Sequence, residues 1–579
     1  MIQAAALIVP HSISSKIQAP FFLLQYADDT LFFSTAQGSA VQVLNQVLTT
    51  FSQVSGIDLN LGKSALIVPH SISSKIQAPF FLLQYADDTL FFSTAQGSTV
   101  QVLNQVLTTF SQVSGIDLNL GKSALITFNL TSQQEQSVRR VLQVDVSTFP
   151  LSYLGLPLTL RRPDRLTFQN LIYKVQQKLE GWKSALLSRA WRVVLASTVL
   201  SAIPIYFMSV FKLPMWVIKE LDRLRRNFIW GSANNTGRAT HLLSWSRVCL
   251  PKTLGSFGLL DLRLQNISLL LRWWWRLYSE PHSLWGKIAK QLFSKMNPNI
   301  PPLAWNKNGS FFWNDLFSLR SHFQICTSSV IGTGMSTMFW YCNWGGTTMF
   351  YYNSSEKPPS RQLISLRDAL TVWHDLLPNP LTLQQSLLLQ QAQNLIFTAQ
   401  PDRLSWRWTP NGVYTAASAY KFFILSGKVL SPLNFIWKLQ IPESIKFFLL
   451  LLAHGRLLTQ YQLLKRNIPC VQGCILCGHP DRETGDHLFF DCAFSVQLWH
   501  RLGFSQASTQ IHSHVSLQDR LHSWFSTAAN SPDKRIVLAT AFWGIWLKRN
   551  NRIFRNQIRR IEAIQQWIVH EATLFMKFC

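Results

Sequence analysis

The apolar positions of residues 65–130 follow the pattern of short strands and one helix. Two apolar runs, Phe80–Gln84 and Thr89–Phe92, flank the tetrapeptide Tyr85-Ala86-Asp87-Asp88, which predicts a strand–turn–strand hairpin. Apolar residues at helical spacing predict a helix over Val100–Val113, and the alternation in Ile116–Leu120 predicts a further strand.

The block that contains this hairpin occurs twice. Residues 6–64 and 65–123 match at an offset of 59 positions and differ only at Ala40 against Thr99, so Tyr26-Ala27-Asp28-Asp29 repeats the tetrapeptide. Two near-identical copies do not make a solenoid, which needs about three or more repeats; they indicate a recent tandem duplication or an artefact of the gene model. We expect the second copy, which continues into unique sequence, to be built into a domain, and the first copy to lack a partner sheet.

Helical patterns dominate the middle of the chain. After a predicted strand pair at Pro150–Leu158, they cover Leu166–Leu187 and Trp191–Ala202, with interruptions at Pro204 and Pro214. The sequence therefore predicts an α+β protein in which helices predominate.

A change of pattern follows near residue 300. Helical character extends over 260–330, but residues 297–360 are rich in Asn, Pro, Gly, Ser and aromatic residues and are predicted to be irregular or β-rich. Alternation at Asp402–Trp408 and the turn dipeptide Asn411-Gly412 start a new unit, and helices are expected from Ala416 to about Lys465.

The charge of the chain indicates a polyanionic partner. Lys and Arg number 54 against 28 Asp and Glu, a net charge of +26, and residues 161–247 hold 15 cations against 4 acidic residues. Together with 22 Trp, this favours nucleic acid as the partner over a generally basic protein with solvated faces. No apolar run approaches the roughly 18–20 residues that span a bilayer, and the N-terminus lacks the features of a secretory signal.

Three cysteines and a histidine have the spacing of a metal site. Cys474-x2-Cys477-x9-His487-x4-Cys492 offers soft sulfur and nitrogen ligands, which favour tetrahedral Zn²⁺, and four protein ligands predict a structural site. Eight cysteines in this distribution fit a reduced compartment better than a disulfide framework.

Other residues compete for roles at this site. Cys470 or His479 can replace one ligand, and Asp486 or Asp491 can orient His487 from outside the ligand set. The basic segment Arg456–Arg466 lies just upstream, so the site is expected to support a nucleic-acid surface.

The adjacent carboxylates of Asp87 and Asp88 form a second candidate site. Through residue 126 the acidic residues are few, and two neighbouring carboxylates between apolar strands repel each other unless a cation lies beside them. A hairpin turn that presents oxygen ligands on rigid strands suits Mg²⁺.

Together, these pieces resemble plant non-LTR (LINE-type) retrotransposon reverse transcriptases over nearly all of residues 65–560. The matching motifs are the Tyr-Ala-Asp-Asp hairpin, Ser114-Gly115…Asn119…Lys122-Ser123, Ser152-Tyr153-Leu154-Gly155, Ala202-Ile203-Pro204-Ile205-Tyr206, Phe228-Ile229-Trp230-Gly231, His241…Trp245…Cys249-Leu250-Pro251-Lys252, Ile441–Phe447 and the cysteine–histidine set.

The resemblance implies the C-terminal part of a right-hand polymerase. Its implied parts are a duplicated palm segment at 1–64, a partial palm at 65–155, a helical thumb-like domain at 156–260, a connecting region at 261–399, a reverse-transcriptase zinc-binding domain at 400–500 and a helical tail at 501–579.

The resemblance also assigns roles. Asp87 would bind Mg²⁺ with Asp88 beside it, Tyr85 would lie near the incoming nucleotide, and Lys122 would stabilise pyrophosphate unless it is an ordinary solvated lysine. Thumb arginines would meet the phosphates of an RNA–DNA template-primer: Arg189, Arg192, Arg223, Arg225 and Arg226.

One departure from the family bears on activity. Reverse transcriptases have fingers that clamp the nucleotide and a further metal-binding Asp on a palm strand upstream of the hairpin, and the sequence before residue 65 supplies neither. Asp28 or Asp29 can replace that Asp only if the duplicate strand takes the place of the missing palm strand. We therefore expect a degenerate RNA-directed DNA polymerase with little or no autonomous synthesis.

The alternative is a non-catalytic zinc-dependent nucleic-acid-binding protein. The family implies a nuclear location, and the sequence leaves the oligomeric state open.

Overall fold

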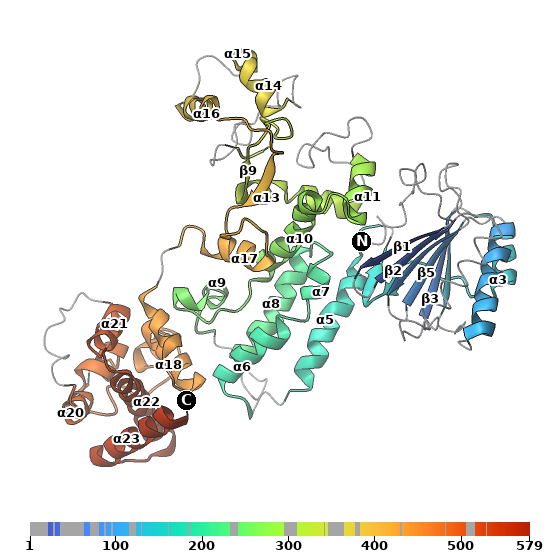
Figure 1. Cartoon of the computed structure of the whole chain (residues 1–579). Coiled ribbons are helices and arrows are strands. Elements are labelled where there is room, and N and C mark those ends of the chain that lie inside the picture. Colours follow the sequence, from blue (N-terminus) through green and yellow to red (C-terminus); the bar gives the residue numbers. More distant parts are fainter. Residues whose placement is uncertain are drawn as a thin grey trace. The chain divides into compact units, whose positions relative to one another are not determined.

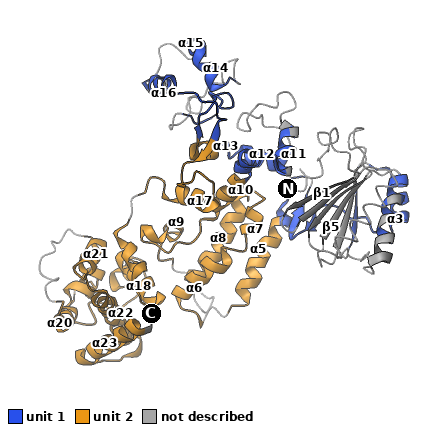
Figure 2. Cartoon of the chain, viewed as in Figure 1, with its two compact units in different colours: residues 1–167, 273–320, 329–403 blue, residues 168–272, 321–328, 404–579 orange. Residues whose placement is uncertain are grey.

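The computed structural model of the chain (Figure 1) is mostly helical with a minority of strands, which confirms the predicted α+β class. It describes residues 21–26, 29–34, 63–69, 80–85, 88–93, 97–114, 123–128, 130–159, 161–182, 186–231, 241–293, 310–340, 342–344, 364–376, 383–428, 431–480, 482–504, 516–528 and 530–578. Two compact units are present (Figure 2): unit 1 comprises residues 1–167, 273–320 and 329–403, and unit 2 comprises residues 168–272, 321–328 and 404–579.

A six-stranded sheet dominates unit 1, with the strand order β1-β2-β4-β5-β3-β6. The strands are β1 (Phe21–Tyr26), β2 (Asp29–Ser34), β3 (Lys63–Pro69), β4 (Phe80–Tyr85), β5 (Asp88–Ser93) and β6 (Ala124–Phe128). Antiparallel pairing of β4 and β5 sets Tyr85 opposite Asp88 and confirms the predicted hairpin. Helix α3 (Gly97–Ser114) confirms the predicted helix and lies beside the sheet in Figure 1, with Val100 and Leu103 buried.

The expectation that the first copy lacks a partner sheet is wrong. Strands β1 and β2 repeat the hairpin, and β2 pairs antiparallel with β4, so that Asp29 lies opposite Tyr85. Strands β3 and β6 run parallel and pair Ala65 with Ala124, which is its own counterpart 59 positions later. The β1–β2 and β4–β5 hairpins have the same sequence and therefore the same alternation of side chains, so the edge of one hairpin fits the edge of the other.

The rest of unit 1 is built from short helices and hairpins. The hairpin of β7 (Leu151–Tyr153) and β8 (Leu156–Leu158) confirms the predicted strand pair. The helices that lie wholly in this unit after α3 are α4 (Ser132–Leu142), α11 (Leu284–Phe293), α12 (Phe311–Phe317), α14 (Leu366–Thr371), α15 (Trp373–Leu376) and α16 (Leu383–Gln393).

Part of the segment 297–360 is helical. These helices agree with the helical character expected over 260–330 and contradict the irregular or β-rich structure expected over 297–360. Helix α12 is followed by α13 (Arg320–Cys326), and the short strand β9 (Thr327–Val330) pairs with β10 (Arg403–Trp406). Aromatic residues pack between these helices: Trp285 of α11 stacks on Trp313 of α12 with 4.6 Å between ring centroids. Residues 345–363 lie outside the described residues.

Helices form most of unit 2. The helices that lie wholly or mostly in this unit are α5 (Arg165–Glu180), α6 (Arg189–Leu195), η2 (Ala196–Leu200), α7 (Ile205–Met208), α8 (Met215–Trp230), α9 (Trp245–Val248), η3 (Lys252–Leu254), α10 (Leu262–Ser279), α13 (Arg320–Cys326), α17 (Ala416–Leu425), η5 (Pro432–Lys438), α18 (Glu443–Ala453), α19 (Gln460–Leu464), η6 (His487–Asp491), α20 (Ala493–Arg501), α21 (Leu517–Thr527), α22 (Pro532–Arg555) and α23 (Ile561–Phe578). Helix α5 ends at Glu180, before Gly181, and is therefore shorter than the predicted Leu166–Leu187.

Helix α18 is the centre of the core of unit 2. Its apolar run is buried, and Phe447 stacks on Phe257 at 5.0 Å and lies 6.1 Å from Trp230, measured between ring centroids. The segments 168–272 and 404–579 therefore share one hydrophobic core. No helix in the described part of the chain is both long and apolar enough to cross a membrane.

Candidate metal centre

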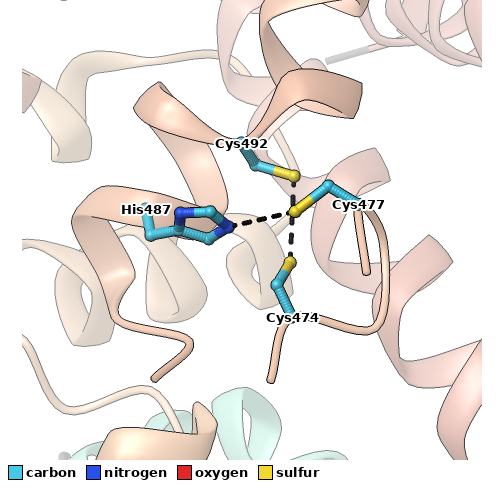
Figure 3. Close-up of side chains that lie close together, drawn as sticks. All are labelled: Cys474, Cys477, His487 and Cys492. Atoms are coloured by element: carbon cyan, nitrogen blue, oxygen red, sulfur yellow. Dashed lines mark hydrogen bonds between the residues drawn. The ribbon is translucent and has the colours of Figure 1, made fainter. Parts of the chain in front are cut away.

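Four side chains of unit 2 converge on one point (Figure 3). The sulfur atoms of Cys474, Cys477 and Cys492 and a ring nitrogen of His487 all lie within 4.8 Å of one another. These are the four residues that the sequence spacing indicates as metal ligands. Cys474 and Cys492 are buried, while Cys477 and His487 are partly exposed.

The distances suit a tetrahedral zinc ion. The sulfur atoms of Cys474 and Cys492 are 3.8 Å apart, and Cys477 Sγ lies 3.4 Å from His487 Nε2. Bonds of about 2.3 Å to sulfur and about 2.0 Å to nitrogen, at tetrahedral angles, put two sulfurs about 3.8 Å apart and sulfur and nitrogen about 3.5 Å apart. The donor set suits Zn²⁺, and these two separations are close to those of a tetrahedral site.

A tight turn presents the first two cysteines. The Cys474 amide donates to the carbonyl of His479 at 2.9 Å, and the Gly478 amide donates to the carbonyl of Cys474 at 2.8 Å. Gly473 has a φ of +79°, and a Cβ there would lie 2.7 Å from the His479 carbonyl oxygen. Only glycine fits this backbone approach without a shift, so Gly473 sets the position of Cys474.

The other two ligands flank the buried helical turn η6. His487 starts this turn, and the Cys492 amide, which follows it, donates to the carbonyl of His487 at 2.6 Å. Between them, Leu488, Phe489 and Phe490 are buried and fix the turn to the core.

Cys492 is the ligand best prepared to be a thiolate. A hydrogen bond from the Cys474 thiol lowers the pKa of Cys492, and the backbone amides of Ser495 and Phe494, at the start of α20, lower it further against the effect of burial. The same sulfur–sulfur contact, together with burial, raises the pKa of Cys474. A bound divalent cation would hold both cysteines as thiolates.

The alternative ligands take no part in the cluster. Cys470 Sγ lies 3.9 Å from the carbonyl oxygen of Gln460, and the ring centroid of His479 is 6.0 Å from that of His487. Asp486 and Asp491, predicted to orient His487, instead both accept hydrogen bonds from Arg520, at 3.1 and 2.9 Å. They therefore fix the His487 turn to helix α21 rather than holding the imidazole ring.

Two arginines of α22, Arg549 and Arg552, contact the segment that carries the metal ligands. Arg552 Nη1 donates to the carbonyls of Ile475 and Leu476 at 2.7 and 3.2 Å, inside the Cys474–Cys477 loop. One helical turn earlier, Arg549 forms a buried ion pair of 2.8 Å with Glu483. The spacing of cysteines and histidines gave no signal for these arginines, because their partners lie 66–77 positions away in the sequence.

We expect Arg552→Ala to loosen the Cys474–Cys477 loop. Two carbonyls would lose a charged donor, so a bound zinc ion should be removed by a chromogenic chelator about tenfold faster, within the 10–100-fold range typical of residues that support metal ligands. Arg555→Ala, on the same helix but exposed, should leave the release rate unchanged. Equal rates in the two variants would contradict the role of Arg552.

The predicted magnesium site lies mostly outside the described residues. Asp28, Asp87, Lys122 and the predicted strand Ile116–Leu120 are not described. Asp29, Tyr85 and Asp88 lie in β2, β4 and β5, at the same end of the sheet, where Tyr85 is in register with both Asp29 and Asp88. The structure gives the backbone placement of these three residues.

Arg192 and Arg225, two of the five arginines predicted to contact phosphates, are buried in the fold, so the predicted contact is wrong for both. Arg192 Nη1 donates to the carbonyl of Gly231 at 2.7 Å. Arg225, 1% exposed, pairs with Asp222 at 2.8 Å. Guanidinium groups buried in this way hold α6 and α8 to their neighbours and do not reach a ligand in solvent.

Of the other three arginines, Arg223 is exposed, and Arg189 and Arg226 are partly exposed. Arg223 pairs with Glu220 at 2.6 Å, and Arg226 lies over the ring of Trp245 at 5.4 Å. Arg189 lines an apolar cavity of about 210 Å³ with residues of α18 and α22. Burial, and then the nearby charge of Arg192, lowers the pKa of Arg189.

Comparisons with known proteins agree with the geometry of the metal centre. Residues 414–499, which include all four ligands, match the family described as zinc-binding in reverse transcriptase. A putative ribonuclease H protein of Arabidopsis thaliana is 26% identical over 439 residues, which cover 72% of this chain and 69% of that protein. An uncharacterized mitochondrial protein of the same plant is 26% identical over 144 residues, 25% of this chain and 92% of that protein. These similarities support a relation between this chain and retrotransposon reverse transcriptases.

Proposed function

We propose that this reverse-transcriptase-related chain binds nucleic acid and that its Cys3His cluster holds a structural Zn²⁺. The observation that carries this proposal is the convergence of four ligand atoms within 4.8 Å in a domain that matches the zinc-binding family. Four protein ligands occupy all coordination positions of a tetrahedral zinc ion and leave none for a reacting water. The ion would therefore stabilise the surrounding fold and would not act in catalysis. The net charge of +26 supports a polyanionic partner.

We also propose that Asp87 and Asp88 are remnants of a magnesium site for RNA-directed DNA synthesis. The antiparallel β4–β5 hairpin supports this reading, because it brings Asp88 opposite Tyr85 at the turn. Such a site needs a third carboxylate on a neighbouring strand. The pairing of β2 with β4 favours Asp29 of the first copy as that residue, because Asp29 lies opposite Tyr85.

A primer-extension assay with Mg²⁺, run beside a binding titration on the same RNA–DNA template-primer, tests both proposals. We expect salt-sensitive binding with little or no nucleotide incorporation, and Asp87→Ala should leave the binding unchanged. Incorporation that Asp87→Ala and Asp29→Ala each abolish would show a working polymerase in which the duplicate supplies a ligand. Binding that is absent, or insensitive to salt, would overturn the nucleic-acid proposal.

A further inference from the structure

The end of α22 and the loop that leads to α23 form an exposed basic surface in unit 2. Arg555, Arg559 and Arg560 are exposed, and two apolar side chains lie among them: Phe554 is 76% exposed and Ile558 is 71% exposed. Within the part of the chain that the structure describes, these three guanidinium groups form no ion pair. The residues 554–560 are called the α22–α23 loop below.

Positive charge is concentrated on this segment. Residues 548–560 contain six cations and no acidic residue. Lys548 is buried beneath the loop, and burial, followed by the charges of Arg552 and Arg559, lowers the pKa of its amine. Apart from Arg549, which pairs with Glu483, these cations form no ion pair among the described residues. Their mutual repulsion is relieved when an anion binds, so the segment favours an anionic ligand.

The loop is held in a defined position. Asn556 ends α22 in the left-handed conformation with a φ of +50°, and its amide donates to the carbonyl of Asn551. The Lys548 amine donates to the Arg559 carbonyl, and Arg552 binds the carbonyls of Ile475 and Leu476 in the metal-binding loop. A surface fixed in this way loses little conformational entropy when a ligand binds.

We propose that the α22–α23 loop binds single-stranded nucleic acid, with its arginines on the phosphates and Phe554 stacked on a base. This inference rests on the proposed nucleic-acid function, and it places a contact surface beyond residues 414–499, the part that matches the zinc-binding family. An exposed aromatic ring among unpaired arginines is the combination by which proteins bind single strands without reading sequence. An acidic peptide would use the charges but would leave the exposed Phe554 and Ile558 without a partner.

The test is a fluorescence-anisotropy titration of the full zinc-loaded chain with a labelled 20-nucleotide oligouridine, between 50 and 300 mM salt. Each phosphate contact with a single strand contributes about 0.7 to the slope of log affinity against log salt. The triple variant Arg555→Gln/Arg559→Gln/Arg560→Gln should therefore reduce the magnitude of that slope by about 2. Phe554→Ala should weaken binding about tenfold and leave the slope unchanged.

A matched control removes the same charge elsewhere. Arg140→Gln/Arg263→Gln/Lys421→Gln changes three scattered exposed cations and should keep the slope of the parent chain. An unchanged slope in the loop variant, with salt-sensitive binding by the parent, would overturn this inference and leave the proposed function intact. A parent chain that binds no RNA would overturn both. Binding to anionic vesicles that only the loop variant loses, with RNA affinity unchanged, would assign the loop to a membrane surface and also overturn the inference.

Discussion

Cys477→Ala is expected to abolish zinc binding and to unfold the C-terminal part of unit 2. The variant removes one of four ligands, and structural zinc sites contribute about 10–16 kcal/mol of apparent folding free energy in small zinc-binding peptides. That exceeds or matches the whole stability of an ordinary domain, about 5–15 kcal/mol. Elemental analysis should give one zinc per parent chain and none in the variant, and thermal unfolding should lose its main transition.

Cys470→Ala is the matched control. Cys470 is four residues before the first ligand and is partly exposed like Cys477, but its sulfur lies beside the Gln460 carbonyl, outside the cluster. This variant should keep its zinc and shift the unfolding temperature by no more than a few degrees. If it loses the metal while Cys477→Ala retains it, the ligand assignment is wrong.

Arg549→Met should destabilise unit 2 by about 3–5 kcal/mol, because it leaves a buried carboxylate without its partner. Glu483 is 1% exposed and Arg549 is 4% exposed, and they meet at 2.8 Å. Glu483 also accepts a hydrogen bond from the Gln460 amide at 3.2 Å, so the pair joins α22 to the segment before the metal site. Chemical denaturation, monitored by far-ultraviolet circular dichroism, measures the decrease in the free energy of unfolding.

Two further variants separate burial from charge. Glu483→Gln/Arg549→Met removes both charges and should recover much of the lost stability, because no unpaired buried ion remains. Arg501→Met breaks the exposed pair with Glu562, whose side chains are 35% and 53% exposed, and should cost about 0–1 kcal/mol. A double variant as unstable as Arg549→Met would show that packing, and not charge pairing, dominates at this position.

The parts of the fold that could be predicted are those that depend on residues close together in the sequence. The β4–β5 hairpin follows from two apolar runs around an acidic turn, and α3 follows from apolar residues at helical spacing. The four metal ligands lie within 19 residues, so their identity and spacing were enough to group them.

The parts that could not be predicted depend on contacts between distant residues. Arg192 and Arg225 look like surface cations in the sequence, and only the packed fold shows that both are buried against carbonyl and carboxylate groups. Arg520 and Arg552 support the metal loops from helices beyond the cysteine cluster. The pairing of the duplicate hairpin depends on strand edges, which the alternation of apolar residues does not specify.

The central claim is that three sulfurs and one nitrogen close around a single zinc ion. X-ray absorption at the zinc edge of the metal-loaded chain tests this claim most directly. We expect three sulfur ligands at about 2.3 Å and one nitrogen at about 2.0–2.1 Å, with no further light atom bound. A spectrum with a bound water or carboxylate oxygen, or with two sulfurs or fewer, would contradict it.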